Sequence, residues 1–499
     1  MIGKIFSINF HKPKYLLSLF LVFFAVSVLN LQNLKAPWVD ECYSYYGVWH
    51  DSFSEFYNSM LTGINFSPPL YFLFNFCIQL VLPTSIDQLR LQSLIFIIIG
   101  IVLSFLLTRK VFSTLPAFVA TILVLSQSDL IISQAQEARH YAMFFACGAW
   151  VLYEQTFSLT NSKRTRWLLF IAHLSLSLVH YLGIIFSGLV AVALLIFNMD
   201  KPVTKRIPYS IYISWIIAVP FYLILIYNQS SHLGTWSRSN YLIDLLSIYN
   251  DSLLLLSLIV PIIIVLCIVK TKSSKPTAIP PAHNILFATS LLWFATPLLF
   301  WILSICSNVN LFKDRYFMPK EAAIIIITAF LINLLINKMK GTLKIGKNSL
   351  LPIGGTLILA LAIFSLVIKR SLFAIKPERN FYYWLLVKDK ISKSNLPLVF
   401  VGDLLFFPNA YQLPQNSFFL LNDSNLKEVY KKFSNKIHII NNECLTGFES
   451  FILICDTDFN RDVIDANFIQ QDLGTIHDRL EIHIIQFDKI NQKIFDKFN

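Results

Sequence analysis

Two adjacent carboxylates are the first residues in the chain whose types and spacing could do chemistry. Asp40 and Glu41 follow the first long apolar run and lie among aromatic residues that include Trp38 and Tyr43. A carboxylate at a membrane surface is costly unless it is solvated or used. One interpretation is a general base that takes a proton from an acceptor hydroxyl or amine. The alternative is an interfacial helix that carries acidic residues at its N-terminus.

Two arginines outside the apolar runs could bind an anion. Arg139 lies in a Glu-Ala-Arg-His-Tyr segment over 137–141, and Arg315 lies in a Lys-Asp-Arg-Tyr segment over 313–316. A guanidinium can hold a phosphate through two parallel hydrogen bonds. The alternatives are a structural pair between Glu137 and Arg139 and, for Arg315, a side chain that reaches from a helix end toward water.

Two weaker elements lie near these arginines in the expected topology. A Ser-Pro-Pro-Leu-Tyr segment over 67–71 predicts an extended lead into a helix, because proline restricts the residue before it. His180 stands alone between two apolar runs, and such a histidine is more often structural than functional. Neither element identifies a site by itself.

A membrane-embedded framework must position these residues. The chain has 499 residues, of which 55% are hydrophobic and 14% are charged, and its mean hydropathy is +0.60. Apolar runs of about 20 residues are long enough to cross a hydrocarbon core of about 30 Å. About eleven runs are predicted to span the membrane: 15–31, 90–107, 116–133, 141–159, 166–180, 181–197, 208–227, 252–270, 284–306, 316–337 and 350–368.

Loop charge predicts the orientation of these spans. The short basic loops all fall on the cytoplasmic side if the N-terminus is cytoplasmic and residues 69–82, too short to cross, lie along the interface. The first loop (32–89), the segment 133–140, the turn at His180 and the segment 307–315 are then extracytoplasmic. The formal charge of +12 therefore reflects topology, and no nucleic-acid partner is expected.

The chain changes character after the last predicted span. Residues 1–368 are predicted to form a transmembrane domain, and residues 369–499 a soluble extracytoplasmic domain. Short apolar runs at 396–401, 418–421, 436–440, 451–455 and 481–487 predict strands that alternate with helices, as in a small α/β domain. Asp403, Asp456 and Asp458 lie at predicted strand ends, where ligands often bind but where carboxylates are also common loop residues.

Five elements together resemble the GT-C glycosyltransferases. In chain order they are the Asp-Glu pair at 40–41, Pro-Pro-Leu-Tyr at 68–71, Gln-Glu-Ala-Arg-His-Tyr at 136–141, His-Tyr at 180–181 and Asp-Arg-Tyr-Phe-Met-Pro at 314–319. The most similar branch is the bacterial protein-mannosyltransferase-like group of family 39. The rhizobial lipopolysaccharide galacturonosyltransferases and the aminoarabinose transferases are relatives of that branch. The resemblance covers about residues 10–340 and does not extend to the tail.

The resemblance implies transfer of a sugar, with inversion, from a polyprenyl-phosphate-linked donor to an extracytoplasmic glycan, lipid or protein. It implies that Asp40 is the catalytic base and that Glu41 helps to bind the acceptor. Arg139, Arg315 and Lys313 would hold the donor phosphate. The residues expected to line the substrate pocket are Tyr43, Ser67, Pro68, Pro69, Tyr71, Glu137, His140, Tyr141, His180 and Tyr316.

One departure from the family pattern concerns Ser67, which stands where many relatives have a histidine before Pro-Pro. A hydroxyl cannot carry a charge, so its contact with the donor or acceptor is expected to differ. No cofactor is expected. A divalent metal at Asp40 and Glu41 is not expected either, because the sequence shows no complete ligand set.

The expected fold class is an all-α polytopic membrane protein of GT-C type, with about eleven transmembrane helices plus interfacial helices. A small C-terminal α/β domain would be extracytoplasmic, the cell inner (plasma) membrane would be the location, and membrane lipids would be partners. One alternative is a lipid or solute transporter or flippase without chemistry, which predicts ionisable residues inside the spans. Another is a catalytically silent scaffold that works through its tail.

Overall fold

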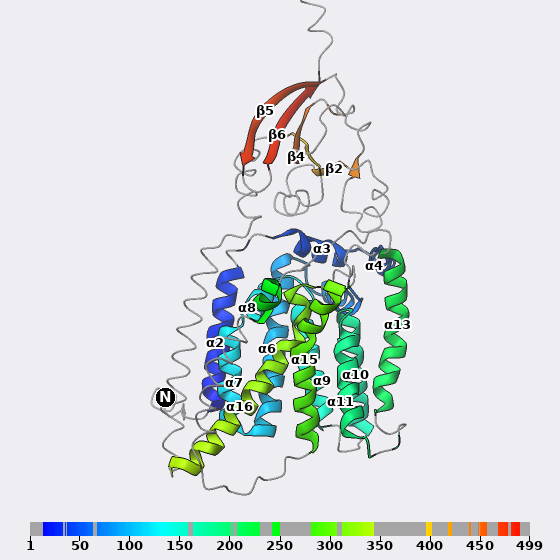
Figure 1. The fold of residues 1–499 in the computed structure, drawn as a ribbon. Helices are drawn as coiled ribbons and strands as arrows, with labels where there is room; N and C mark the ends of the chain where they lie inside the picture. Colours follow the sequence, from blue (N-terminus) through cyan, green and yellow to red (C-terminus); the bar gives the residue numbers. More distant parts are fainter. Residues whose placement is uncertain are drawn as a thin grey trace, which may run out of the picture. The chain divides into compact units, whose positions relative to one another are not determined.

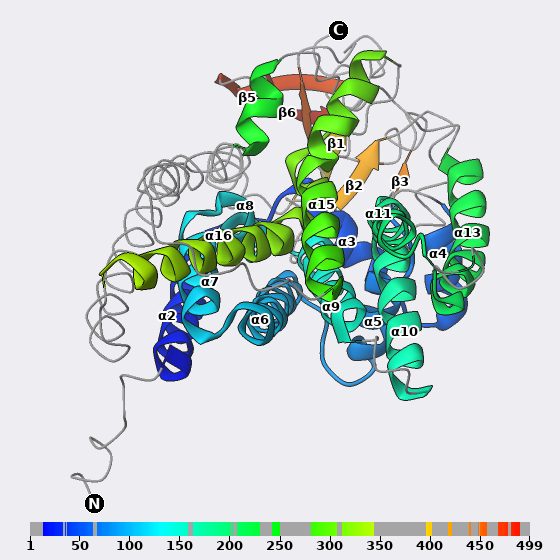
Figure 2. The same cartoon turned by 60° about the horizontal axis from the view of Figure 1, so that its bottom comes forward.

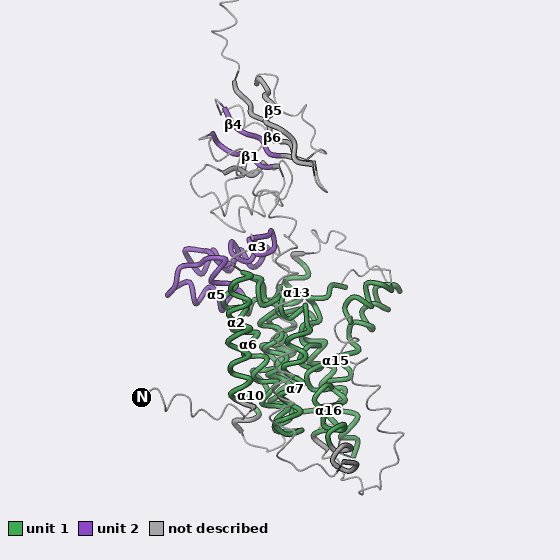
Figure 3. Tube along the Cα trace, turned by 90° about the vertical axis from the view of Figure 1, so that its left-hand side faces the viewer, with its two compact units in different colours: residues 1–32, 67–71, 90–373 green, residues 33–66, 72–89, 374–499 purple. Residues whose placement is uncertain are grey.

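The computed structural model describes residues 13–32, 35, 37–62, 67–157, 163–200, 202, 207–229, 242–249, 281–306, 312–343, 396–401, 418–421, 439–440, 448, 450–456, 468–477 and 481–489. The predicted spans at 252–270 and 350–368 and the predicted domain boundary at 368 lie outside these residues. The chain divides into two compact units, coloured separately in Figure 3. The first comprises 1–32, 67–71 and 90–373, and the second comprises 33–66, 72–89 and 374–499.

The first unit is a bundle of apolar helices, most of which run side by side in Figure 1. The helix α16 (Pro319–Leu343) runs obliquely to the others in both Figure 1 and Figure 2, and it packs against α7, α9 and α15. The first unit also contains α2 (Pro13–Gln32), α6 (Ile86–Phe112), α7 (Thr114–Gln127), α8 (Asp129–Gln134), α9 (Tyr141–Phe157), α10 (Lys163–Val179), α11 (Gly183–Phe197), α13 (Tyr209–Gln229), α15 (Pro281–Cys306) and a helix over 242–249.

These helices make the chain an integral membrane protein. Within the described residues, five helices are long and apolar enough to cross a membrane: Tyr15–Gln32, Ile86–Phe112, Tyr209–Tyr227, His283–Cys306 and Pro319–Ile336. Many apolar side chains on these helices are exposed, such as Val22 at 61% and Ile216 at 69%. That exposure suits a surface in contact with lipid.

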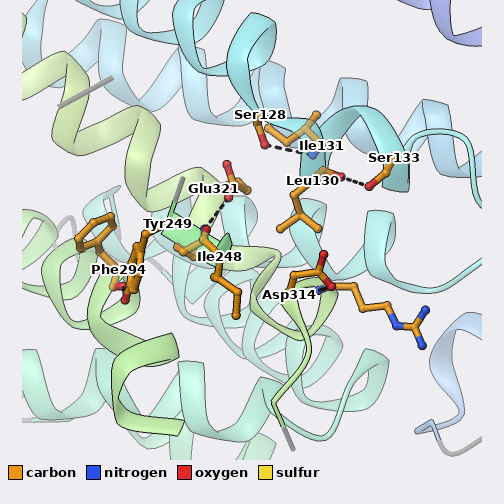
Figure 4. Close-up of polar contacts among 11 residues, drawn as sticks. Ser128, Leu130, Ile131, Ser133, Ile248, Tyr249, Phe294, Asp314 and Glu321 are labelled. Carbon is orange, nitrogen blue, oxygen red and sulfur yellow. Dashed lines mark hydrogen bonds and ion pairs between the residues drawn. The ribbon is translucent and has the colours of Figure 1, made fainter. Parts of the chain in front are cut away.

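One predicted span was wrong in its continuity. The sequence predicted a single span over 116–133, but the structure has two helices, α7 and α8, that meet at Ser128. The Ser128 hydroxyl accepts a hydrogen bond from the backbone N–H of Ile131 at 3.1 Å (Figure 4), which is the standard cap of a new helix. The short helix α8 therefore begins the segment that leads to Arg139.

Contacts between helix ends define two ends of the bundle. At one end, Gln32 of α2 bonds the backbone of Arg90 and Ala135, so the end of α2 meets the start of α6 and the link between α8 and α9. At the other, the ring of Phe112 at the end of α6 contacts His283 near the start of α15, and Lys110 lies over the ring of Phe157 at the end of α9. The candidate residues of this unit lie near the first of these ends.

The described helices of the second unit belong to the first loop. They are α3 (Val39–Val48), α4 (Phe53–Leu61) and most of α5 (Leu70–Gln79), whose first two residues belong to the first unit. The rings of Phe56 and Phe76 stack at 4.6 Å between α4 and α5. The ten residues of α5 extend about 15 Å, half of a hydrocarbon core, so this helix is too short to cross.

The tail contributes a six-stranded mixed sheet, with strand order β3-β2-β1-β4-β6-β5. The strands β1 (Leu398–Val401), β2 (Phe418–Leu421), β3 (Ile439–Ile440) and β4 (Ser450–Asp456) are parallel, whereas β5 (Phe468–His477) and β6 (Glu481–Lys489) add an antiparallel edge. All five predicted apolar runs contain strands. The sequence reasoning missed β5, because its polar residues Gln470, Gln471 and Asp472 interrupt the apolar pattern on which strand prediction rests.

Candidate functional site

Two arginines from distant parts of the sequence meet at one tyrosine ring. The guanidinium carbon of Arg139 lies 5.9 Å from the centroid of the Tyr141 ring, and that of Arg315 lies 5.5 Å from the same centroid. Arg139 is only 7% exposed, whereas Arg315 is partly exposed. Two permanent positive charges therefore share one small region of the first unit, where an anion would be attracted by both.

Two stacked histidines lie beside these arginines. The rings of His140 and His180 are 5.3 Å apart with an interplanar angle of 27°, and Phe144 stacks on His180 at 4.8 Å. Burial, followed by the nearby charges of Arg139 and Arg315, lowers the pKa of His180 to about 3. Burial, His180 and the same two arginines hold the pKa of His140 well below its ordinary value. Both imidazoles are therefore neutral at pH 7.

The turn that carries His180 is held by three contacts. The Nδ1 atom of His180 accepts a hydrogen bond from the backbone N–H of Leu182 at 3.1 Å. The hydroxyl of Tyr222 on α13 donates to the carbonyls of Ser177 and His180. The turn is followed by Gly183, and only glycine fits at this position, because a Cβ there would lie 1.9 Å from the carbonyl oxygen of Leu176. The imidazole is consequently fixed in position between α10 and α11.

Ser67 lies against the other histidine. Its hydroxyl is 3.3 Å from Nδ1 and 3.4 Å from Nε2 of His140, and it is only 2% exposed. The ring of Tyr71 lies edge-on to the same imidazole at 6.1 Å. The sequence predicted that Ser67 would contact the substrates differently from a histidine, and in the described residues its contact is with the His140 ring. Pro68 is buried beside it, and Pro69 is half-buried.

The turn that carries Arg315 is a short 3-10 helix (Asp314–Phe317) that precedes α16. The carboxylate of Asp314, labelled in Figure 4, accepts a hydrogen bond from the backbone N–H of Arg315 at 2.7 Å. The ring of Tyr316 contacts Tyr141 at 6.0 Å and His180 at 5.2 Å. Lys313 precedes this turn and is half-buried.

A polar network that sequence reasoning missed holds the Arg139 segment in place. The Gln32 amide donates to the carbonyls of Arg90 and Ala135, and the Arg90 guanidinium donates to the Gln32 carbonyl. The Ser93 hydroxyl donates to the Arg139 carbonyl at 3.4 Å. Arg90 is only 1% exposed. An arginine at the first position of a predicted span is the sequence signal that could have identified it.

A second missed feature is a buried ion pair in the first turn of α16. Lys320 Nζ lies 3.0 Å from a carboxylate oxygen of Glu321, and both residues are at most 3% exposed. The Lys320 ammonium also donates to the carbonyl of Ile248, beside Tyr249 and Glu321 in Figure 4. The pair lies within the predicted span 316–337, where each buried charge needs the other as a partner. The sequence signal that could have identified this pair is two adjacent residues of opposite charge near the start of a predicted span.

The carboxylate pair belongs to the second unit. Asp40 and Glu41 lie in the first turn of α3 and are 6% and 0% exposed. A Glu41 carboxylate oxygen accepts a hydrogen bond from the backbone N–H of Trp38 at 3.3 Å, so this residue caps the helix. Tyr43 is half-buried on the same helix.

Glu137 lies in the loop before α9, and its carboxylate accepts a hydrogen bond from the amide of Gln134 at 3.2 Å. The backbone N–H of Arg139 donates to the Glu137 carbonyl at 2.8 Å, which tightens this loop.

In the part of the chain that the structure describes, no group of three or more His, Cys, Asp and Glu side chains could hold a metal ion. The candidate site is thus built from two guanidiniums, two neutral imidazoles and several aromatic rings, a set suited to an anion with an apolar tail.

Comparison by sequence finds no matching family model and no matching curated protein. Comparison of structures finds several matches, among them two crystal structures of ArnT from Cupriavidus metallidurans, an aminoarabinose transferase. The structure bound to undecaprenyl phosphate has a TM-score of 0.62 and 11% sequence identity, and the apo structure has a TM-score of 0.61 and 12% identity. Each match covers 94% of this chain and 97% of the ArnT chain. The chain therefore has the polytopic GT-C fold that the sequence motifs implied.

Proposed function

We propose that this protein is a membrane glycosyltransferase that moves a sugar from a polyprenyl-phosphate-linked donor to an extracytoplasmic acceptor, with inversion at the sugar carbon. The observation that carries the proposal is the meeting of Arg139 and Arg315 at the Tyr141 ring. The structurally similar ArnT is bound to undecaprenyl phosphate in one of its crystal structures, which supports a polyprenyl phosphate as the anion.

The proposed role of the arginines follows from the leaving group. When the bond between the sugar carbon and the phosphate oxygen breaks, the polyprenyl phosphate gains negative charge. Two guanidiniums already fixed near that phosphate stabilise this charge without further reorganisation. The site does not need a strong general acid for that reason, and the neutral His140 and His180 do not compete with the arginines for the anion.

Asp40 is proposed to act at the acceptor. The acceptor hydroxyl or amine attacks the sugar carbon, and its proton passes to the Asp40 carboxylate. A single displacement of this kind forms one bond as the other breaks, so it inverts the configuration. Support for this role comes from the resemblance to GT-C enzymes, in which the carboxylate at the position of Asp40 is the base, and from the placement of Asp40 in the first turn of α3.

The experiment that tests the donor site measures affinity for a polyprenyl monophosphate on the full-length protein in detergent. Arg139→Ala and Arg315→Ala should each weaken binding by about tenfold or more, because each removes a charge-assisted contact. The corresponding Lys variants should be less impaired, since lysine keeps the charge but loses the planar fork.

Arg166→Ala is the matched control for the loss of an arginine. Arg166 is exposed on α10, about 20 Å of helix away from His180. Its replacement should leave the affinity unchanged. If monodisperse Arg139→Ala and Arg315→Ala proteins bind the lipid as tightly as the wild type, the proposed donor site is wrong.

A further inference from the structure

The hydrogen bond within the His180 turn determines which ring nitrogen carries the proton. The backbone N–H of Leu182 donates to Nδ1 of His180, so Nδ1 must be unprotonated. A neutral imidazole with an unprotonated Nδ1 carries its hydrogen on Nε2. His180 is consequently a hydrogen-bond donor at Nε2, and its tautomer is set by the backbone of its own turn.

The same contact determines the direction of the ring. Nδ1 faces the turn that follows His180, and Nε2 lies on the opposite side of the imidazole, away from that turn. The ring itself is contacted by the rings of His140, which precedes α9, of Phe144 on α9 and of Tyr316, at centroid distances of 4.8 to 5.3 Å. The donor is therefore preorganised, because neither the tautomer nor the ring orientation has to change when a ligand arrives.

The surroundings of the ring favour an anionic partner for this donor. Arg139 and Arg315 are close enough to His180 to lower its pKa, in addition to the larger effect of burial. A group that accepts a hydrogen bond from Nε2 in that field gains from both guanidiniums if it is negatively charged. A third buried cation beside Arg139 and Arg315 would increase the electrostatic repulsion in the protein when no anion is bound, whereas a neutral hydrogen-bond donor does not.

We propose that His180 is a substrate-binding residue whose neutral Nε2–H donates a hydrogen bond to the phosphate held by Arg139 and Arg315. The proposal rests on the proposed function, because the ligand is the same phosphate. It assigns a specific atom, tautomer and ligand group to a histidine that the resemblance places in the substrate pocket without a defined contact.

Substitution of His180 by asparagine or by glutamine tests the roles of the two ring nitrogens separately. The amide of His180→Asn reaches the place of Nδ1 and keeps an acceptor for the Leu182 N–H, but it loses the distal donor. The amide of His180→Gln reaches the place of Nε2 and keeps the distal donor. If His180 binds phosphate, the Gln variant should bind polyprenyl monophosphate within a few-fold of the wild type, and the Asn variant about tenfold more weakly.

A second ligand keeps the proposal testable if one variant folds poorly. Polyprenol has the same chain without the phosphate, so a contact with phosphate predicts that His180→Asn lowers affinity for the monophosphate and leaves affinity for polyprenol unchanged. An equal loss for both ligands, or full affinity of the Asn variant for the monophosphate, would overturn the proposal. His283→Asn is the matched control, because His283 contacts Phe112 at the other end of the bundle.

Arg139→Ala, measured in the same assay, distinguishes failure of this inference from failure of the proposed function. Weak binding by Arg139→Ala with normal binding by His180→Asn would remove the role of His180 and leave the phosphate site in place. Normal binding by both variants would contradict the phosphate site itself, and with it the inference.

Discussion

The two histidines of the candidate site, His140 and His180, have pKa values below that of a free histidine. The pKa of His180 falls from 6.5 to about 3, chiefly because its ring is buried and then because of Arg139 and Arg315. The groups that face His180 from α9 and from the turn before α16 are His140, Tyr141 and Tyr316. Between pH 3 and 6.5 the unfolded chain therefore binds more protons at this position than the folded chain.

This shift predicts the pH dependence of stability. The free energy of unfolding rises with pH wherever the unfolded state binds more protons, so the contribution of His180 is complete above pH 6.5 and is lost as the pH falls toward 3. We expect the melting temperature in detergent to fall over that window, and to fall less steeply in His180→Phe. Equal slopes for the wild type and His180→Phe would show that His180 does not titrate as described.

Residue types near the site were predictable from the sequence, but their contacts were not. The Glu-Ala-Arg-His-Tyr and Asp-Arg-Tyr segments marked Arg139 and Arg315 because cations outside the cytoplasmic loops ask for a partner. The contact of Ser67 with His140 spans 73 residues of sequence, and no local pattern encodes such a pairing. The tautomer of His180 likewise depends on the geometry of its turn.

At the scale of single elements, a buried ion pair links the start of α16 to a neighbouring helix. The helix α16 begins with the buried pair Lys320 and Glu321, and the Lys320 ammonium also binds the carbonyl of Ile248 at 2.9 Å. Ile248 belongs to a helix over 242–249. This contact joins that helix to α16 only a few residues beyond the turn of Arg315.

A buried ion pair predicts a characteristic pattern of mutant stabilities. Lys320→Met alone leaves the Glu321 carboxylate buried without its cation, which costs about 3–5 kcal/mol. The double variant Lys320→Met with Glu321→Gln should recover much of that loss. A double-mutant cycle of unfolding free energies in detergent measures the coupling. Additive losses would show that the two side chains do not interact as the structure indicates.

Helices of the bundle were more predictable than their ends. Hydropathy located α2, α6, α9, α10, α11, α13, α15 and α16, because a 20-residue apolar run has few other stable structures in a membrane. It did not locate the break between α7 and α8, because Ser128 acts there through one hydrogen bond to Ile131. In the tail, β5 was missed since its stability comes from pairing with β6.

For the whole molecule, the distribution of basic residues predicts one orientation in the membrane. Cysteines placed at Asp51 and Asp314, both exposed, should react with an impermeant thiol reagent from outside, whereas one at the exposed Lys110 should not. The seven native cysteines must be replaced first. Reactivity at Lys110 with protection at Asp314 would reverse the proposed orientation.

At the scale of the whole molecule, the fold is shared with ArnT although the two sequences differ at most positions. A GT-C fold shared with ArnT over 94% of the chain, at 11% identity, shows that the architecture persists where most side chains differ. A fold alone does not determine chemistry. The case for glycosyl transfer therefore depends on the proposed phosphate site at Arg139 and Arg315 together with the proposed base Asp40.

Mass spectrometry of cell-envelope lipids, glycans and glycoproteins tests the central claim most directly. It would compare cells that carry the wild-type gene, cells that lack it, and cells that carry Asp40→Asn at the same protein level. Glycosyl transfer predicts that at least one envelope species loses the mass of one sugar residue in the deletion. The same species should be reduced about 100-fold in Asp40→Asn, because the amide keeps the shape of the side chain but cannot accept the proton. Identical envelope species in all three strains would contradict the account.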